Sequence, residues 1–219
     1  MSKTHIYCVP GLAANGKIFE HIKLPKEKYK LHLIKWLIPK SIDESIEHYA
    51  QRMTESITED NFVLMGVSFG GIMVQEMSKI VQPKKVIIIS SVKSRKELPR
   101  RLKLTKLIKA YKLFPANSIT TIENFMSYSF GKMTKKRIEQ YQMYLSVRNP
   151  IYLNWAIYNV LHWKQDDVLQ NIYHIHGTED NVFPFKHIKN CISIKGGSHI
   201  MIINKAKKIS KIINGILEE

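Results

Sequence analysis

The segment Gly66-Val67-Ser68-Phe69-Gly70 constrains the fold most, because it joins an apolar run to a helical pattern through a glycine-rich turn. The pattern predicts a strand over residues 61–67 and a helix over residues 69–81. At such a strand-to-helix turn, a serine between glycines holds its hydroxyl clear of the backbone, with room for a substrate carbonyl. The five-residue pattern recurs by chance, so its meaning depends on partner residues elsewhere in the chain.

Strands and helices alternate along the first ninety residues. A capping box at Ser41 and Glu44, followed by apolar residues at helical spacing, predicts a helix over residues 41–57. A shorter helix is expected over residues 17–22. This alternation implies a mostly parallel sheet with helices on both faces. Further strands are predicted over residues 4–9, 29–37 and 85–90.

The alternation stops between residues 91 and 170. About eighty residues separate two consecutive core strands there, where a short loop and one helix would suffice. The segment is predicted to form several helices. We therefore expect two parts: a core made of residues 1–90 and 171–219, and a helical insertion made of residues 91–170.

Two further motifs supply possible partners for Ser68. A short apolar strand ends in the pattern H-G-x-x-D-x-x-x-P, with His176, Gly177, Asp180 and Pro184 in the fixed positions. Farther on, the glycine-rich loop Gly196-Gly197-Ser198 presents His199 ahead of an apolar helix. The order serine, aspartate, histidine resembles that of the α/β-hydrolase superfamily, and the motifs are spread over most of the chain.

The resemblance implies a three-layer α/β fold with a mostly parallel sheet of about six strands. The superfamily's first two strands are missing, so the sheet begins with the strand that feeds the oxyanion loop. The insertion of residues 91–170 is then a helical cap over the active site. The resemblance also implies that the backbone N–H groups of Phe69 and Leu12 form the oxyanion hole. The family often has His-Gly where this chain has Pro10-Gly11, which leaves Leu12 or Ala13 open as the second donor.

Acyl transfer needs a nucleophile, a base, a group that orients the base, and donors for the oxyanion. We assign Ser68 as nucleophile, His199 as general base and then acid, and Asp180 as the group that holds the imidazole tautomer. An alternative remains for each of these residues: Ser68 as merely a small turn residue, His199 as a polar loop cap, and Asp180 as a helix N-cap. Glu179 competes with Asp180, but the superfamily's acid usually falls four residues after the histidine of the His-Gly pair.

Charge and aromatic content bear on the substrate. The net charge of +16 suggests nucleic-acid binding, yet lysine is abundant throughout and no nucleic-acid-binding motif is present, so we expect no specific binding of this kind. Residues 93–112 predict a basic amphipathic helix, which either packs as an ordinary solvated helix or attracts an anionic acyl donor or lipid surface. The later cap is rich in aromatic residues, expected mostly as cap core: Phe125, Tyr128, Phe130, Tyr141, Tyr144, Tyr152, Trp155, Tyr158 and Trp163.

Other chemistries find little support. Cys8 and Cys191 are each expected in a buried strand, as inert thiols of a cytoplasmic protein. We expect no secretory signal, because the apolar run near the N-terminus is too short, and no membrane span, because no apolar run approaches ~18 residues. No metal or other cofactor is expected: C-x-x-C and H-x-x-x-H patterns are absent, and we expect His174 and His176 to face opposite sides of their strand.

The sequence thus predicts a serine hydrolase of the carboxylesterase or thioesterase kind. It would cleave a small or medium ester or thioester through an acyl-enzyme on Ser68. One alternative is a lyase-type reaction with the same three residues, since fold does not fix function. Another is a binding protein on a retired hydrolase scaffold, which the retention of Ser68, Asp180 and His199 argues against.

Overall fold

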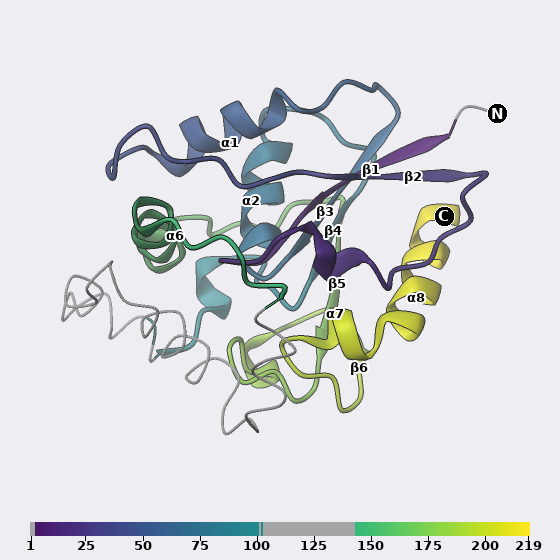
Figure 1. Cartoon of the computed structure of the whole chain (residues 1–219). Coiled ribbons are helices and arrows are strands. Elements are labelled where there is room, and N and C mark those ends of the chain that lie inside the picture. The colour runs from purple at the N-terminus through teal and green to yellow at the C-terminus, as the bar shows by residue number, and fades with distance from the viewer. Residues whose placement is uncertain (1–2, 101, 103–142) are drawn as a thin grey trace.

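Six parallel strands form one sheet in the order β2-β1-β3-β4-β5-β6. The computed structural model describes residues 3–100, 102 and 143–219 (Figure 1). The expected sheet of six strands is confirmed, and β1 is paired between β2 and β3. The strands are β1 (Thr4–Val9), β2 (Tyr29–Leu33), β3 (Phe62–Val67), β4 (Val86–Ile89), β5 (Ile172–Gly177) and β6 (Ile192–Ile194).

Helices cover both faces of this sheet. Figure 1 shows α1 and α2 on one side and α8 on the other. The helices of the described residues are α1 (Ile46–Thr54), α2 (Phe69–Ser78), α6 (Pro150–His162), α7 (Met201–Asn204) and α8 (Ala206–Glu218), with short 3-10 helices η1 (Gly16–Phe19), η2 (Arg95–Glu97) and η4 (Phe185–His187). The fold is therefore a three-layer α/β sandwich.

The side chains along each strand alternate between the two faces of the sheet, which divides the hydrophobic core into two clusters. Tyr7 and Val9 of β1 pack with residues of α1, α2 and α6, whereas Ile6 and Cys8 pack with residues of α7 and α8. Successive strand side chains point to opposite faces, so both sets must be apolar when helices cover both faces. This explains why the strands form apolar runs in the sequence.

The helix predicted over residues 41–57 is shorter and is capped by another residue. Ser45, not Ser41, is the N-cap, and its side chain accepts a hydrogen bond from His48 N. Glu44 does not complete a capping box, because its buried carboxylate accepts two hydrogen bonds from Arg52 and one from Lys40 N. Glu44 instead pairs with Arg52 of α1, and the helix begins one turn later than the predicted capping box.

Three other expectations need correction. The strand predicted over residues 29–37 ends at Leu33. Cys191 precedes β6 and is only partly buried, whereas Cys8 is fully buried in β1, where burial raises the pKa of its thiol. The predicted basic helix does not begin at Lys93, whose buried ammonium donates hydrogen bonds to the carbonyls of Lys189 and Asn190.

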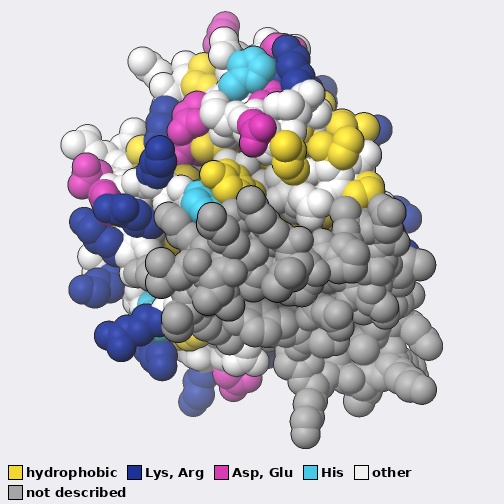
Figure 2. Space-filling view, turned by 90° about the vertical axis from the view of Figure 1, so that its left-hand side faces the viewer, with side chains coloured by type: hydrophobic (Ala, Val, Ile, Leu, Met, Phe, Trp, Pro, Cys, Tyr) yellow, Lys and Arg dark blue, Asp and Glu magenta, His cyan; other side chains and the backbone are white. Residues whose placement is uncertain are grey.

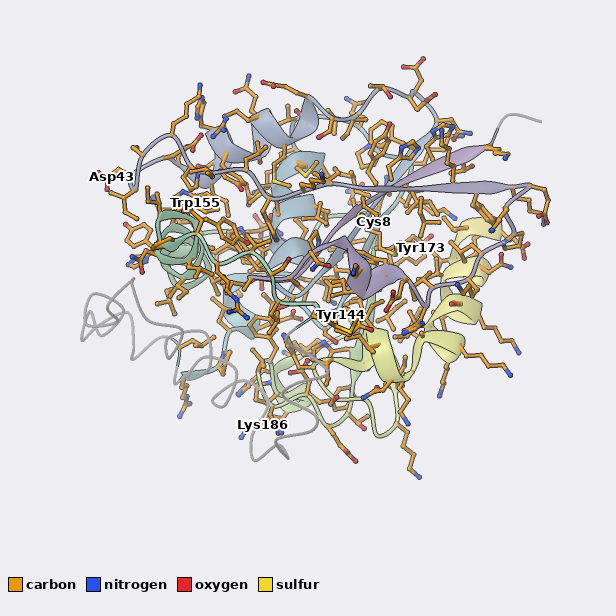
Figure 3. All side chains as sticks on the ribbon, in the orientation of Figure 1. Cys8, Asp43, Tyr144, Trp155, Tyr173 and Lys186 are labelled. Atoms are coloured by element: carbon orange, nitrogen blue, oxygen red, sulfur yellow. The ribbon has the colours of Figure 1, made fainter. Side chains whose placement is uncertain are left out.

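Much of the predicted cap lies outside the described residues. This applies to Lys103 to Lys112 of the basic helix and to Phe125, Tyr128, Phe130 and Tyr141. Within the described part, α6 is helical, and its Tyr152 and Trp155 are buried in the core. Figure 3 labels Trp155 at α6. Figure 2 shows Lys and Arg side chains gathered along one flank of the face that it presents.

No helix in the described ranges combines the length and the apolar character that crossing a bilayer requires.

Candidate active site

The predicted nucleophile lies at a strained turn between β3 and α2. Ser68 has φ 54° and ψ −120°, a backbone conformation that L-residues rarely adopt. Its backbone N–H donates to Ile89 O (3.0 Å), and its carbonyl accepts from the hydroxyl of Ser91 (2.7 Å). These bonds from β4 and the segment after it hold the turn, and the side chain stands at the carboxyl end of the central strands.

Glycines allow this turn to be tight. A Cβ added to Gly66 would lie 2.2 Å from Gly70 O, and one added to Gly70 would lie 2.3 Å from the carbonyl oxygens of Val9 and Pro10. No L side chain fits at such distances. The two glycines of the motif are therefore required where α2 crosses the strands β3 and β1.

The loops that carry Asp180 and His199 are joined to each other. Glu179 N donates to Gly197 O (2.9 Å), and Gly196 N donates to the hydroxyl of Thr178 (2.9 Å). A Cβ on Gly177 would lie 2.1 Å from Gly197 O, so the two glycine-containing loops meet backbone to backbone. Both loops follow neighbouring parallel strands, β5 and β6. They therefore lie at the carboxyl end of the sheet, as Ser68 does.

The structure brings the three predicted side chains into one hydrogen-bonded chain. His199 Nδ1 lies 2.9 Å from Asp180 Oδ2, and His199 Nε2 lies 2.9 Å from Ser68 Oγ. A carboxylate can only accept, so Nδ1 of His199 carries the proton that it donates to Asp180. The neutral ring then accepts at Nε2, and the Ser68 hydroxyl donates to it.

Asp180 is held as a carboxylate. Its Oδ1 accepts hydrogen bonds from Val182 N (2.8 Å) and Phe183 N (2.9 Å). Burial on its own raises the pKa of Asp180, but attraction to His199 and these hydrogen bonds outweigh it and hold the pKa below its ordinary value. One carboxylate oxygen thus binds the turn at Val182 while the other contacts His199. Asp180 is not a helix N-cap, because the next helix, η4, begins at Phe185 after Pro184.

The expectation that His174 and His176 face opposite sides is wrong. Their rings lie on the same face, with His174 Nε2 3.0 Å from His176 Nδ1, because residues two apart in a strand share a face. His176 Nε2 donates to Phe183 O (2.9 Å) and lies 3.5 Å from Asp180 Oδ2. Burial lowers the pKa of both histidines, so they are neutral side chains that support the Asp180 loop from behind.

The predicted oxyanion donors flank Ser68. Phe69 is the first residue of α2, where backbone N–H groups lack an intrahelical acceptor. Gly11 lies against the nucleophile, since a Cβ on it would be 3.5 Å from Ser68 Cβ. Neither Phe69 N–H nor Leu12 N–H has a hydrogen-bond acceptor among the residues that the structure describes.

Sequence reasoning missed the aromatic cluster beside this loop. Trp36 Nε1 donates to Gly11 O (3.0 Å), and the Trp36 ring stacks on Phe69 at 5.2 Å between centroids. Tyr152 of α6 also packs against Trp36, at 5.3 Å between ring centroids. Trp36 falls at the end of the predicted strand over residues 29–37, and no local pattern distinguishes it from a core residue.

No group of three or more histidine, cysteine, aspartate or glutamate side chains within residues 3–100 and 143–219 is arranged to hold a metal ion. The candidate site consists of side chains and backbone donors.

No protein-family model matches the sequence, and no curated protein matches it. Solved structures do. An esterase from Thermogutta terrifontis is 12% identical, with a TM-score of 0.75 over 99% of this chain and 90% of that chain. An esterase from Exiguobacterium antarcticum is 17% identical, with a TM-score of 0.70 over 100% of this chain and 93% of that chain.

A third similar structure belongs to novel epoxide hydrolases of the α/β-hydrolase superfamily from metagenomes of hot environments. It is 8% identical, with a TM-score of 0.69 over 99% of this chain and 91% of that chain. At such low identities the similarity establishes the fold. The predicted α/β-hydrolase fold is therefore confirmed.

Proposed function

We propose that this chain, which has the α/β-hydrolase fold, is a serine hydrolase that cleaves a small or medium ester or thioester. The observation that carries the proposal is the hydrogen-bonded chain from Ser68 through His199 to Asp180, with 2.9 Å at each link. A serine hydroxyl is a weak nucleophile until a neighbouring base accepts its proton. The neutral Nε2 of His199 is placed to be that base.

The first half-reaction forms an acyl-enzyme. Ser68 Oγ attacks the carbonyl carbon as its proton passes to His199 Nε2, and the carbonyl oxygen becomes an oxyanion. The N–H groups of Leu12 and Phe69 stabilise this oxygen, while the Asp180 carboxylate stabilises the imidazolium. His199 then gives the proton to the departing alcohol or thiol, and the acyl group remains on Ser68.

The second half-reaction releases the acid. A water molecule attacks the acyl carbon as its proton passes to His199 Nε2, and a second oxyanion forms at the same N–H groups. Collapse of this intermediate returns the proton to Ser68 Oγ and frees the carboxylic acid. The proton balance closes with the residues named, so the cycle needs no cofactor.

We further propose that residues 91–170 form a cap over this site. The described part supports the proposal: α6 packs its buried Tyr152 and Trp155 against Trp36, Tyr49 and Phe69, next to the turn at Ser68. The cap would choose the acyl group, and its basic residues favour an anionic acyl donor or an anionic surface. The two free cysteines fit a cytoplasmic enzyme.

Steady-state and burst kinetics test the proposal. A series of chromogenic esters and acyl thioesters of graded chain length is assayed with the wild type and with Ser68→Ala. A serine hydrolase turns over part of the series and releases a burst of the first product equal to the enzyme concentration where deacylation is slower, and Ser68→Ala does neither.

Two rivals predict different results. A lyase with the same three residues reacts with a Ser-directed phosphonate but shows no acyl-enzyme burst with any ester. A retired binding protein turns over no ester and binds its ligand equally well after Ser68→Ala. Either outcome contradicts the proposal.

A further inference from the structure

The chain that returns from the cap is bonded to the loop that carries Leu12. We call residues 143–147 the return segment and residues 10–15 the oxyanion loop. Asn15 N donates to Tyr144 O (2.8 Å), and Val147 N donates to Ala13 O (3.0 Å). These two backbone bonds resemble a short ladder between segments that lie about 130 residues apart in the sequence.

The side chain of Asn15 completes this connection. Its Nδ2 donates to Met143 O (3.1 Å) and to the hydroxyl of Ser146 (2.8 Å), and its Oδ1 accepts from Lys17 N (2.8 Å). Both amide hydrogens and the amide oxygen are therefore used. One side chain caps η1 and also fixes the return segment to the oxyanion loop.

The bonds hold a strained residue in place. Ala13 has φ 61°, which costs an L-residue about 1–2 kcal/mol. Its carbonyl accepts a hydrogen bond from Val147 N (3.0 Å). The returning chain thus holds the carbonyl side of this strained residue.

Two further bonds orient the peptide that carries Leu12 N–H. Gly11 O accepts from Ala14 N (3.0 Å) and from Trp36 Nε1 (3.0 Å). In a trans peptide the N–H points away from the preceding carbonyl, so Leu12 N–H points away from both of these donors. Gly11 lies against Ser68, so we assign the adjoining Leu12 N–H as the loop donor for the oxyanion.

We propose that Asn15 is a positioning residue that, together with Ser146, holds the oxyanion loop so that Leu12 N–H stabilises the transition state. The inference rests on the proposed serine hydrolase. Asn15 does not touch the substrate; it acts through the backbone of the loop. Its loss therefore weakens a bond that matters most once the carbonyl oxygen has become negative.

The size of the effect follows from known donors. Removing one oxyanion donor costs about 10²–10³ in kcat, and a displaced donor retains part of its effect. For Asn15→Ser we expect kcat to fall about 10-fold while KM stays within about 2-fold, the signature of a lost transition-state interaction. The serine still caps η1 but is too short to reach Met143 O.

The test compares three variants on the best chromogenic ester. Asn15→Ser removes both side-chain bonds to the return segment, and Ser146→Ala removes one and should lower kcat about 3-fold. Asn61→Ser is the matched control, because Asn61 Nδ2 also bridges two segments, at 3.4 Å to Lys3 O and to Thr4 Oγ1, near the opposite end of the sheet. The control should match the wild type.

Inhibition by a trifluoromethyl ketone analogue of that ester supplies the second readout. Its adduct with Ser68 carries an anionic oxygen, so its inhibition constant should rise in Asn15→Ser by the same factor by which kcat/KM falls. A purely structural role lowers the melting temperature and the active fraction but leaves the inhibition constant of the folded enzyme unchanged.

Three results would overturn the inference. One is wild-type kcat and inhibition constant in Asn15→Ser, and another is a raised KM with unchanged kcat. If Asn15→Ser does not fold, the result of Ser146→Ala decides, and unchanged kinetics there count against the inference. Retention of full turnover by Ser68→Ala removes the proposed function itself, whereas an inactive Ser68→Ala with unaffected Asn15→Ser removes this inference alone.

Discussion

The hydroxyl oxygen of Ser68 lies 2.9 Å from Nε2 of His199, although 131 residues separate them in the chain. If this contact is the base–nucleophile pair, Ser68→Ala and His199→Ala should each lower kcat by about 10⁴–10⁶-fold. The double variant should lose no more than either single one, because the residues act as a unit. Additive losses in the steady-state rates of the three variants would show that the two side chains act independently.

Asp180 and Glu179 are adjacent acids with different surroundings. Asp180→Asn retains an oxygen for Val182 N and Phe183 N, so the loop should keep its shape, but its amide favours the wrong tautomer of His199. We expect kcat to fall about 10⁴-fold, as for the corresponding change in serine proteases.

The exposed Glu179 provides the control for Asp180→Asn. Glu179→Gln should have wild-type kcat, because only the Glu179 backbone N–H is bonded to the histidine loop, at Gly197 O. A larger loss of kcat in Glu179→Gln than in Asp180→Asn would reverse the assignment of the acid.

The buried carboxylate of Glu44 should make stability depend on pH. Burial raises the pKa of Glu44, but hydrogen bonds from Arg52, Lys40 N and His48 outweigh this effect and lower it below the ordinary value. A depressed folded-state pKa stabilises the protein above the unfolded value, and this stabilisation is lost as pH falls through the folded one. Glu44→Gln should therefore be less stable than the wild type by about 2 kcal/mol at pH 7.

Urea unfolding at pH 7 and below pH 4 checks this prediction for Glu44. The gap between wild type and Glu44→Gln should shrink at the lower pH. Glu27→Gln, at an exposed position, should stay within about 0.5 kcal/mol of the wild type at both pH values. A gap for Glu44→Gln that does not change with pH would mean that packing, and not charge, is lost.

Two glycines in helices should respond to alanine in opposite ways. Gly70→Ala forces a Cβ to within 2.3 Å of the backbone of β1 and should cost about 3 kcal/mol or more, with loss of turnover. Gly215 of α8 has no atom within 4 Å of an added Cβ, so Gly215→Ala should raise stability by about 0.5–1 kcal/mol. Thermal unfolding measures both, and a stabilised Gly70→Ala would contradict the described crossing of α2 over β1.

The sequence allowed the sheet and the three converging side chains to be predicted, because both depend on strong local signals. The strand over residues 4–9 matches β1 residue for residue, since an apolar run buried on both faces ends at a proline and a glycine. The turn at Ser68 is equally local, because Gly66 and Gly70 are required within five residues of each other.

The features that could not be predicted depend on contacts between residues far apart in the sequence. Ser41 and Ser45 both precede helical patterns, and Trp155 of α6 donates a hydrogen bond to the carbonyl of Glu44, just before the observed N-cap at Ser45. The hydrogen bonds of Asn15 to the return segment join residues about 130 positions apart, and no sequence motif indicates them. The choice between Leu12 and Ala13 as donor depends on these contacts, which is why the sequence left it open.

The central claim is that Ser68 is a nucleophile activated by His199. Its most direct test is covalent labelling with a fluorophosphonate, followed by peptide mass spectrometry. The account predicts a single adduct, located on Ser68, that forms at least about 10²-fold more slowly in His199→Ala because the hydroxyl then lacks its base. An adduct on another residue with the Ser68 peptide unmodified, or equal labelling rates in the wild type and His199→Ala, would contradict it.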